Sequence, residues 1–480
     1  MKTFVTLLAL GAATACTGLA AEPALTIYNQ NFAVVRDTVP LDLKPGVNEV
    51  RFAGATAHVE PDSVILRDPA GQRSLQILEQ NYRNDPVSQE LLLSLFEGQT
   101  IDFQWDRLKD NTTVREVIPG KIIRSGYDPG GRHTQPIIEV GGKLQFRLPG
   151  QPLFPSLGDD TVLKPAFNWL LRSDQPGRFD AEVGYVTGGF QWEADYNLVA
   201  PEQGDFVDLI GWITMNNHSG TTFRDAKIKL MAGDVQKIQP QLRFLGGMRL
   251  DGPAPMAAEA AVTEKSFDEF HLYTLARPTT LRDRETKQVE FVRAERVHAP
   301  VNYVYDGAGP LRFRGGLNQE RGYGAGEVTK KVRVTREFVN AETNQLGLAL
   351  PAGKLRFYRR NDDGQLEFTG EDRIDHTPRQ ETVRVTTGHA FDLVGERKQM
   401  NFRVDTGDKW LEETFTIKLR NRKPAPVEIR VVEHLHRWSQ WVIRGTSHPY
   451  RKTDAQTIEF QIAVPPDVEQ VVTYTAYYTW

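Results

Sequence analysis

Cysteine is almost absent from this sequence, because Cys16 is the only one in 480 residues. Cys16 also lies in a segment that has the features of a removable leader. Without it the chain has no disulfide, no thiolate ligand for a metal and no cysteine nucleophile. We therefore predict that packed apolar cores alone hold the protein together, and the chain is long enough to build them.

An excess of charge of one sign is also missing, since 58 basic residues stand against 62 acidic ones. No basic stripe of the kind that neutralises a phosphate backbone is present, which disfavours binding to nucleic acid. The sequence further lacks the GxSxG, HExxH and Walker motifs. These absences lower the expectation of an enzyme, and no cofactor is predicted.

The first 21 residues have the composition of a signal peptide. Lys2 provides a positive start, and residues 4–15 form an apolar stretch too short to span a bilayer stably. The sequence GLA at 18–20 fits a small-x-small cleavage rule. The ATA that precedes Cys16 is a loose match to a lipoprotein box, so a lipid anchor at Cys16 is an alternative to ordinary cleavage. We predict export to the periplasm or cell envelope, and an outer-membrane lipoprotein if Cys16 is lipidated.

Apolar residues alternate with period two through most of the chain, in runs bounded by Gly, Pro, Asn and Asp. One predicted helix interrupts this pattern, with Asp85 as its N-cap and Pro86 in its first turn. Its apolar face would consist of Leu91, Leu92 and Leu95. The sequence therefore predicts an all-β fold, a multidomain β-sandwich with one short helix near the N-terminus.

Shifts in composition divide the chain into three predicted domains behind the leader at 1–21. Residues 22–150 form an N-terminal β domain that contains the helix and a small barrel-like module, and a connector with four prolines follows. Residues 151–378 form a central β-sandwich with a flexible insert near 240–265, rich in Ala, Pro and Gly. Residues 379–480 carry about seven short strands, as expected of an immunoglobulin-like sandwich.

Several strand-and-turn phrases resemble an uncharacterised bacterial exported family. They are LTIYNQNFAVVRDTVPLDL, GGFQWEADYNLVA, GWITMNNHSGTTFRDAKIKLMAGDV, ETFTIKLRNRKPAPVEIRVVEHLHRW and DAQTIEFQIAVPPDVEQVVTYTAYYTW. The family carries the domain of unknown function 4139, which it shares with mucoidy-inhibitor A-like proteins. Those relatives have a coiled coil before the shared domain, whereas this sequence has no sustained heptads. The resemblance implies a fold and an envelope location, and it implies no residues in catalytic roles.

Two histidines form a candidate metal site. His434 and His436 lie two residues apart on a predicted strand, so both rings project from one face. At that spacing they could chelate zinc or copper, with His448 as a third ligand. The alternative is a half-exposed sheet face that the rings share with Val432 and Trp438.

Two carboxylate pairs are candidates for catalysis: Asp159 with Asp160, and Glu193 with Asp195. General acid–base cleavage of a sugar bond needs two carboxylates on opposing elements. Glu193 and Asp195 would instead share one face of an amphipathic strand. Asp159 and Asp160 could equally set a turn in the proline-rich connector.

The sequence GYGAG at 322–326 has a superficial likeness to a phosphate-binding loop. A phosphate loop needs a helix N-terminus directly behind it, whereas 327–334 has the pattern of a strand. We therefore predict a flexible hairpin or mobile loop.

The function predicted from the sequence is a structural or binding module of the cell envelope, with an unidentified envelope protein or a glycan as its partner. One alternative is an envelope hydrolase that acts on glycan or peptide. A second is an outer-membrane β-barrel, suggested by the alternation of Val472, Tyr474, Ala476 and Tyr478 up to Trp480.

Overall fold

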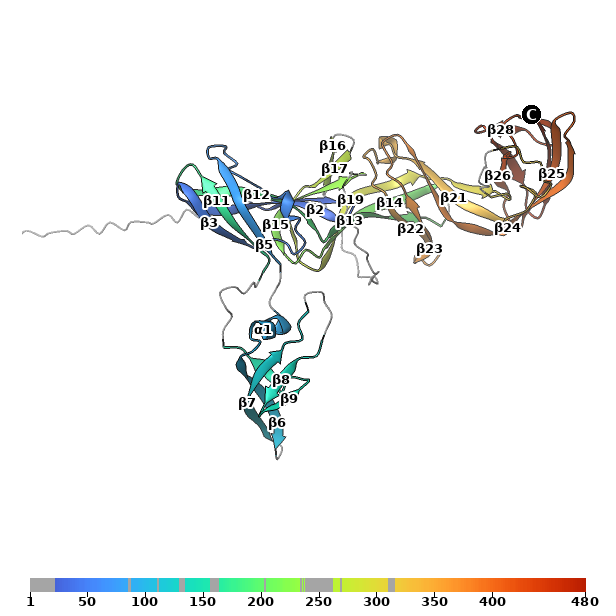
Figure 1. Cartoon of the computed structure of the whole chain (residues 1–480). Coiled ribbons are helices and arrows are strands. Elements are labelled where there is room, and N and C mark those ends of the chain that lie inside the picture. Colours follow the sequence, from blue (N-terminus) through green and yellow to red (C-terminus); the bar gives the residue numbers. More distant parts are fainter. Residues whose placement is uncertain are drawn as a thin grey trace, which may run out of the picture.

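The computed structural model describes residues 22–84, 88–109, 112–128, 134–155, 164–202, 204–233, 235, 237, 262–267, 270–309 and 316–480. These residues form many β-strands and one short α-helix, which confirms the predicted all-β, multidomain sandwich. The strands build an elongated body, and a small unit projects from its side (Figure 1). The predicted leader lies outside the described residues, as does the insert near 240–265 up to residue 261.

A long, mostly antiparallel sheet forms one layer of the central body. It contains eight strands, with β18 (Thr279–Leu281) paired to β15 outside the main path. The main path follows the order β16 (Val262–Phe267), β17 (Phe270–Leu275), β15 (Phe223–Ala232), β1 (Ala24–Tyr28), β2 (Phe32–Leu43), β12 (Gly177–Gly188) and β4 (Ile65–Arg67).

Two smaller sheets pack with this layer around one shared core. One has the order β3 (Gly46–Ala53), β11 (Ala166–Ser173) and β5 (Leu75–Arg83). The other, the five-stranded sheet, has the order β19 (Glu285–His298), β14 (Phe206–Asn217), β13 (Phe190–Ala200), β22 (Gly353–Arg360) and β23 (Leu366–Ile374). Short 3-10 turns occur at Pro61–Ser63 and Glu342–Asn344. Between layers, the Trp192 indole N–H donates to the carbonyl of Met231 at 3.1 Å.

The predicted boundary at residue 150 does not divide this core. β1 and β2 hydrogen-bond to β15 and β12, so strands from both predicted domains complete one sheet. Neither segment could bury its apolar face alone, because each supplies only part of the shared layer.

A separate small unit spans the helix and five strands. Its sheet has the order β10 (Gln151–Leu153), β6 (Thr100–Lys109), β7 (Thr112–Arg124), β8 (Ile137–Val140) and β9 (Lys143–Gln145). Its core is small and consists of Leu93, Ile101, Phe103, Ile122 and Ile138. The strand β10 belongs to this unit although it follows residue 150, because it pairs with β6.

The helix α1 (Gln89–Leu95) lies close to its predicted place with a different cap. The Ser88 hydroxyl accepts a hydrogen bond from the Leu91 N–H at 3.1 Å, which makes Ser88 the N-cap. The predicted cap Asp85 and the following Pro86 lie outside the described residues. The predicted apolar face is correct for Leu92, which is buried, but Leu95 is 52% exposed and Leu93 is buried instead. A helix of about two turns is oriented by the sheet that it covers more than by its own periodicity.

The C-terminal unit is one curled, nine-stranded sheet with its own core. The order is β27 (Trp441–Thr446), β30 (Glu469–Thr479), β25 (Trp410–Asn421), β24 (Thr382–Asp405), β21 (Lys331–Val339), β20 (Val301–Tyr305), β26 (Val427–His434), β29 (Thr457–Val464) and β28 (Tyr450–Lys452). The sheet therefore includes β20 and β21, which precede the predicted domain start at residue 379.

Two long strands join the central body to the C-terminal unit (Figure 1). In β24, Val383 and Val385 are buried in the central core, whereas Leu393 is buried in the C-terminal core. In β21, Phe338 and Val332 divide between the two cores in the same way. The two units thus share continuous strands at their junction.

The segment 316–328, which we call the strap, contains the glycine-rich sequence and forms turns without strands, where a flexible hairpin or mobile loop was predicted. Arg397 donates to the carbonyls of Gly324 at 2.7 Å and Gly326 at 3.4 Å. Arg437 donates to the carbonyls of Glu320 at 2.7 Å and Tyr323 at 2.6 Å. Two arginines of the sandwich thus hold the backbone of the strap.

Both arginines are themselves paired inside the sandwich. Arg397 lies 2.9 Å from the carboxylate of Glu433, and their side chains are 1% and 0% exposed. Tyr474 donates its hydroxyl hydrogen bond to Glu433 at 2.5 Å. Arg437 lies 2.9 Å from the equally buried carboxylate of Glu413. Each guanidinium group therefore contacts a buried carboxylate on one side and backbone carbonyls of the strap on the other.

Among the described residues, none of the helices has the length and apolar content needed to span a bilayer.

Candidate functional site

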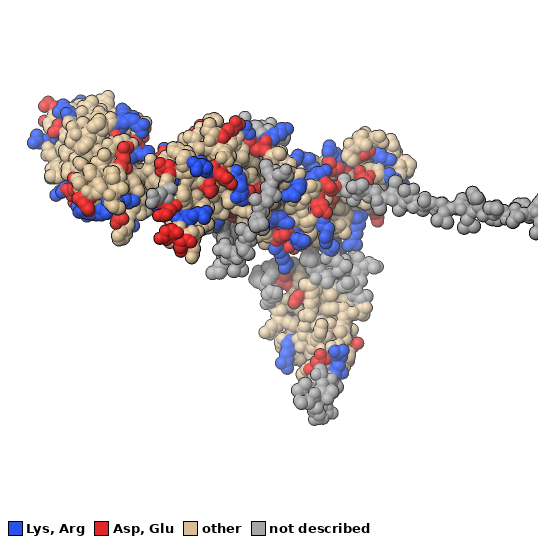
Figure 2. All heavy atoms as spheres, turned by 180° about the vertical axis from the view of Figure 1, so that it is seen from behind, with Lys and Arg blue, Asp and Glu red and all other residues tan. Residues whose placement is uncertain are grey.

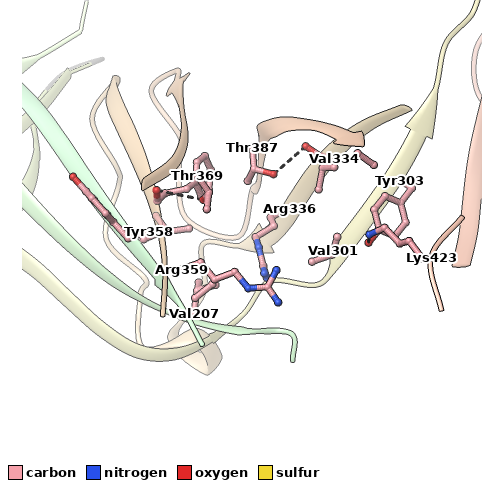
Figure 3. Close-up of a pocket in the computed structure, with 14 residues that line it drawn as sticks. Val207, Val301, Tyr303, Val334, Arg336, Tyr358, Arg359, Thr369, Thr387 and Lys423 are labelled. Carbon is pink, nitrogen blue, oxygen red and sulfur yellow. Dashed lines mark hydrogen bonds between the residues drawn. The ribbon is translucent and has the colours of Figure 1, made fainter. Parts of the chain in front are cut away.

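A pocket lies at the junction between the central body and the C-terminal unit (Figure 3). Its volume is about 200 Å³. Three cationic side chains line it, namely Arg336, Arg359 and Lys423. Apolar walls come from both units, with Val207 and Phe357 from the five-stranded sheet and Val301 from the C-terminal sheet.

Strand register places one wall of the pocket. Arg336 on β21 is opposite Val301 on β20, and Val334 is opposite Tyr303. Because side chains alternate along a strand, these four lie on the same face of the sheet. Arg359 comes from the other unit, where β22 runs parallel to β13. The pocket therefore exists only where the two sheets meet.

Arg336 is a buried cation without a carboxylate partner. It is 8% exposed, and one guanidinium nitrogen donates to the carbonyl of Ala299 at 2.6 Å. No ion pair joins it to any described residue. Burial lowers the pKa of Arg336, the negative charge of Asp205 raises it in part, and the positive charge of Arg359 lowers it further. Burying a cation that no ion pair neutralises is costly, and a bound anion would reduce this cost.

The other two cations also lack ion pairs among the described residues. Arg359 donates to the carbonyl of Glu202. The Lys423 ammonium donates to the Tyr303 hydroxyl at 2.7 Å and lies 4.5 Å from the centre of its ring. Each of these contacts satisfies a donor without neutralising a charge.

The positive charge of the pocket is local. On the face of the molecule seen in Figure 2, basic and acidic side chains are interspersed over the elongated body. The formal charge of the whole chain is −4. An anion would therefore be attracted by the pocket itself and not by a generally basic surface.

The structure describes one of the two predicted carboxylate pairs, Glu193 with Asp195, and places both residues on β13. Asp195 is buried, accepts from the Thr214 hydroxyl at 2.8 Å and lies 3.8 Å from Arg356. Glu193 is on the same strand, two residues away. The two carboxylates thus come from one strand, as the sequence pattern predicted.

Asp159 and Asp160, the second predicted pair, lie outside the described residues.

The predicted histidines are brought together in part. The rings of His434 and His436 stack with centroids 5.1 Å apart, and His434 lies 3.2 Å from Asp306. His448 instead accepts from the Ser447 hydroxyl at 2.8 Å or donates to it. Within the described part of the chain, no three His, Cys, Asp or Glu side chains form a group that could hold a metal ion.

The stacked histidines titrate in opposite directions. Burial lowers the pKa of His434, but the hydrogen bond and charge of Asp306 outweigh it and raise that pKa above 6.5. For His436, burial and the charge of His434 together lower the pKa below 6.5. Protonation of His434 therefore stabilises the folded state, whereas protonation of His436 destabilises it.

We expect two variants to separate these contributions. A raised folded pKa contributes stability that is lost as pH rises above the ordinary histidine pKa. The wild type should therefore exceed His434→Gln in free energy of unfolding at pH 6 more than at pH 8. A lowered folded pKa has the opposite sign, so the difference between wild type and His436→Gln should shrink as pH falls from 6.5 to 5. Urea unfolding across this range would measure both, and equal pH slopes in the two variants would contradict the assignment.

The sequence interpretation missed the pocket, although one signal for it was present. Along β21 the inward positions are Val332, Val334, Arg336 and Phe338, so a single arginine interrupts an apolar series. The partners Arg359 and Lys423 come from segments that only the fold brings together.

Comparison with protein-family models and with the curated proteins finds no match to this chain. Membership of the exported family with the domain of unknown function 4139 therefore stays a prediction.

Proposed function

We propose that this chain is an exported cell-envelope protein that binds a small anionic molecule in the pocket between its two β-sandwich units. The main support for this proposal is that Arg336, Arg359 and Lys423 line one pocket and form no ion pair with any described residue. The proposal retains the expectations from the sequence: export, the family with the domain of unknown function 4139, and an immunoglobulin-like C-terminal sandwich.

The attraction of one anion to both arginines is expected to exceed the repulsion between the two guanidinium groups. At 4 Å and an effective dielectric constant of 20, each cation attracts a unit anion by about 4 kcal/mol before desolvation. One anion between two guanidinium groups gains this attraction twice and also screens their mutual repulsion. Carboxylate and phosphate oxygens both match the geometry of a guanidinium group.

The lining favours binding over hydrolysis. Among the described residues that line the pocket there is no His, Asp, Glu or Cys. Histidine and carboxylates are the commonest general acids and bases, and the lining Lys423 and Tyr303 hydrogen-bond to each other. The two lining threonines use their hydroxyls as donors to backbone carbonyls, Thr387 to Val334 and Thr369 to Phe357, each at 3.4 Å (Figure 3).

We expect phosphate to stabilise the protein specifically. A ligand that binds only the folded state at 100 times its dissociation constant adds about 2.7 kcal/mol to the free energy of unfolding. Thermal unfolding of the mature chain in sodium phosphate should therefore show a Tm that rises with the logarithm of phosphate concentration above the dissociation constant. Sodium chloride at equal ionic strength serves as the control for general screening. If phosphate, sulfate and acetate all leave Tm at the chloride value, the proposed function is wrong.

A further inference from the structure

The three cations of the pocket divide into two positions. Arg336 and Arg359 come from different units, and Figure 3 shows their guanidinium groups directed to the same part of the pocket. Their proximity is also expressed in the pKa of Arg336, which the charge of Arg359 lowers. Lys423 lies apart from them, at Tyr303 (Figure 3).

The strand register gives the spacing between these positions. Arg336 is opposite Val301 on β20, and Lys423 contacts Tyr303, which is two residues further along the same strand. Two residues of an antiparallel strand correspond to about 7 Å between Cα atoms, which sets the scale of the separation. Val301 lines the pocket between them and presents only hydrocarbon.

This arrangement matches a molecule with charges at two ends. Figure 3 shows Lys423 on the other side of Val301 from the two guanidinium groups, so an anionic group placed between Arg336 and Arg359 lies away from the ammonium. A single small anion would leave the partly buried Lys423 with only its hydrogen bond to Tyr303, whereas a second anionic group would give it an ion pair. Apolar side chains between the two positions suit an aliphatic spacer, because water is displaced from hydrocarbon on both partners.

We propose that the ligand is a dianion in which a short apolar spacer separates two anionic groups, with one group at Arg336 and Arg359 and the other at Lys423. This inference rests on the proposed function and specifies its ligand class. Because the arginine position draws on both units and Lys423 belongs to the C-terminal unit, such a ligand also joins the two units.

The experiment compares adipate with hexanoate by isothermal titration calorimetry on the full mature chain. The two ligands have the same number of carbons, but only adipate has a second carboxylate, at about the required spacing. One additional charge-assisted hydrogen bond corresponds to roughly tenfold or more in affinity. We therefore expect adipate to bind at least about tenfold more tightly than hexanoate. Inorganic phosphate is titrated in parallel as a compact anion without a spacer.

Two variants assign the ends of the ligand. Lys423→Met should reduce the affinity for adipate to that for hexanoate and leave hexanoate binding unchanged. Lys398→Met removes an exposed lysine of the same unit that does not line the pocket, so it should retain the preference for adipate. Circular dichroism of each variant establishes that it is folded.

The outcomes separate this inference from the proposed function. Equal affinities for adipate and hexanoate, or an unaltered preference in Lys423→Met, would overturn the dianion and leave the anion site in place. Tighter binding of phosphate than of adipate would do the same, because it would show that a compact anion fills the site. If none of the three ligands binds, the proposed function itself fails.

Discussion

Replacing Arg397 with methionine is expected to lower the free energy of unfolding of the C-terminal unit by about 3–5 kcal/mol. The variant would leave the carboxylate of Glu433 charged in a site where it is 0% exposed. It would also remove two hydrogen bonds to the strap and the packing of the guanidinium group 3.8 Å from the centre of the Phe415 ring. Urea unfolding followed by tryptophan fluorescence measures the loss.

Two further variants make this test specific. Arg67→Met breaks the ion pair between Arg67, 61% exposed, and Glu182, 31% exposed. Its loss should lower the free energy of unfolding by less than about 1 kcal/mol. Glu433→Met combined with Arg397→Met removes both charges and should recover part of the loss. If Arg397→Met is no more harmful than Arg67→Met, the buried pair does not stabilise the sandwich as described.

Replacing Arg336 with methionine is expected to abolish anion binding to the junction pocket. Truncation of one partner in a buried, charged hydrogen bond costs about 2–5 kcal/mol, which corresponds to a loss in affinity of about 30-fold or more. The bound anion would lose the more buried of its two guanidinium partners, since Arg336 is 8% exposed. Calorimetric titration with adipate or phosphate measures the change.

Arg333→Met is the matched control, because Arg333 is exposed on the same strand and removes the same formal charge. Arg333→Met should change the affinity for the anion only slightly, because salt screens the long-range effect of an exposed charge. Equal affinities in Arg336→Met and the wild type would show that the anion binds elsewhere on the protein.

The strand content of the chain was predictable because its signal is local. Alternation such as that of β30, where Val472, Tyr474, Ala476 and Tyr478 are buried, follows directly from the period of a strand. The helix was placed for a similar reason, although its cap is Ser88 and its buried pair is Leu92 and Leu93.

Domain boundaries were less predictable, because strand pairing joins segments far apart in the sequence. β1 pairs with β15 in parallel, and β20 pairs with β26 in the same way. Composition and turn residues near these strands do not indicate either pairing, because parallel neighbours are joined by long connections and not by a tight turn. The proline-rich connector at 149–165 was a reasonable signal for a boundary, but it leads from the small unit back into the shared core.

The candidate site depended on tertiary structure in the same way. A lone arginine in the apolar alternation of β21 was visible in the sequence, but its meaning required Arg359 from the neighbouring sheet. The strap shows the complementary case. Its glycines suggested mobility, and the two arginines that hold it come from β24 and from the segment after β26.

Diffraction from crystals soaked in sodium selenate, recorded at the selenium absorption edge, tests the anion site most directly. The account predicts an anomalous selenium peak between the guanidinium groups of Arg336 and Arg359, at a position from which the selenate oxygens accept hydrogen bonds from both. Selenate at other surface positions with none between these two side chains would contradict it.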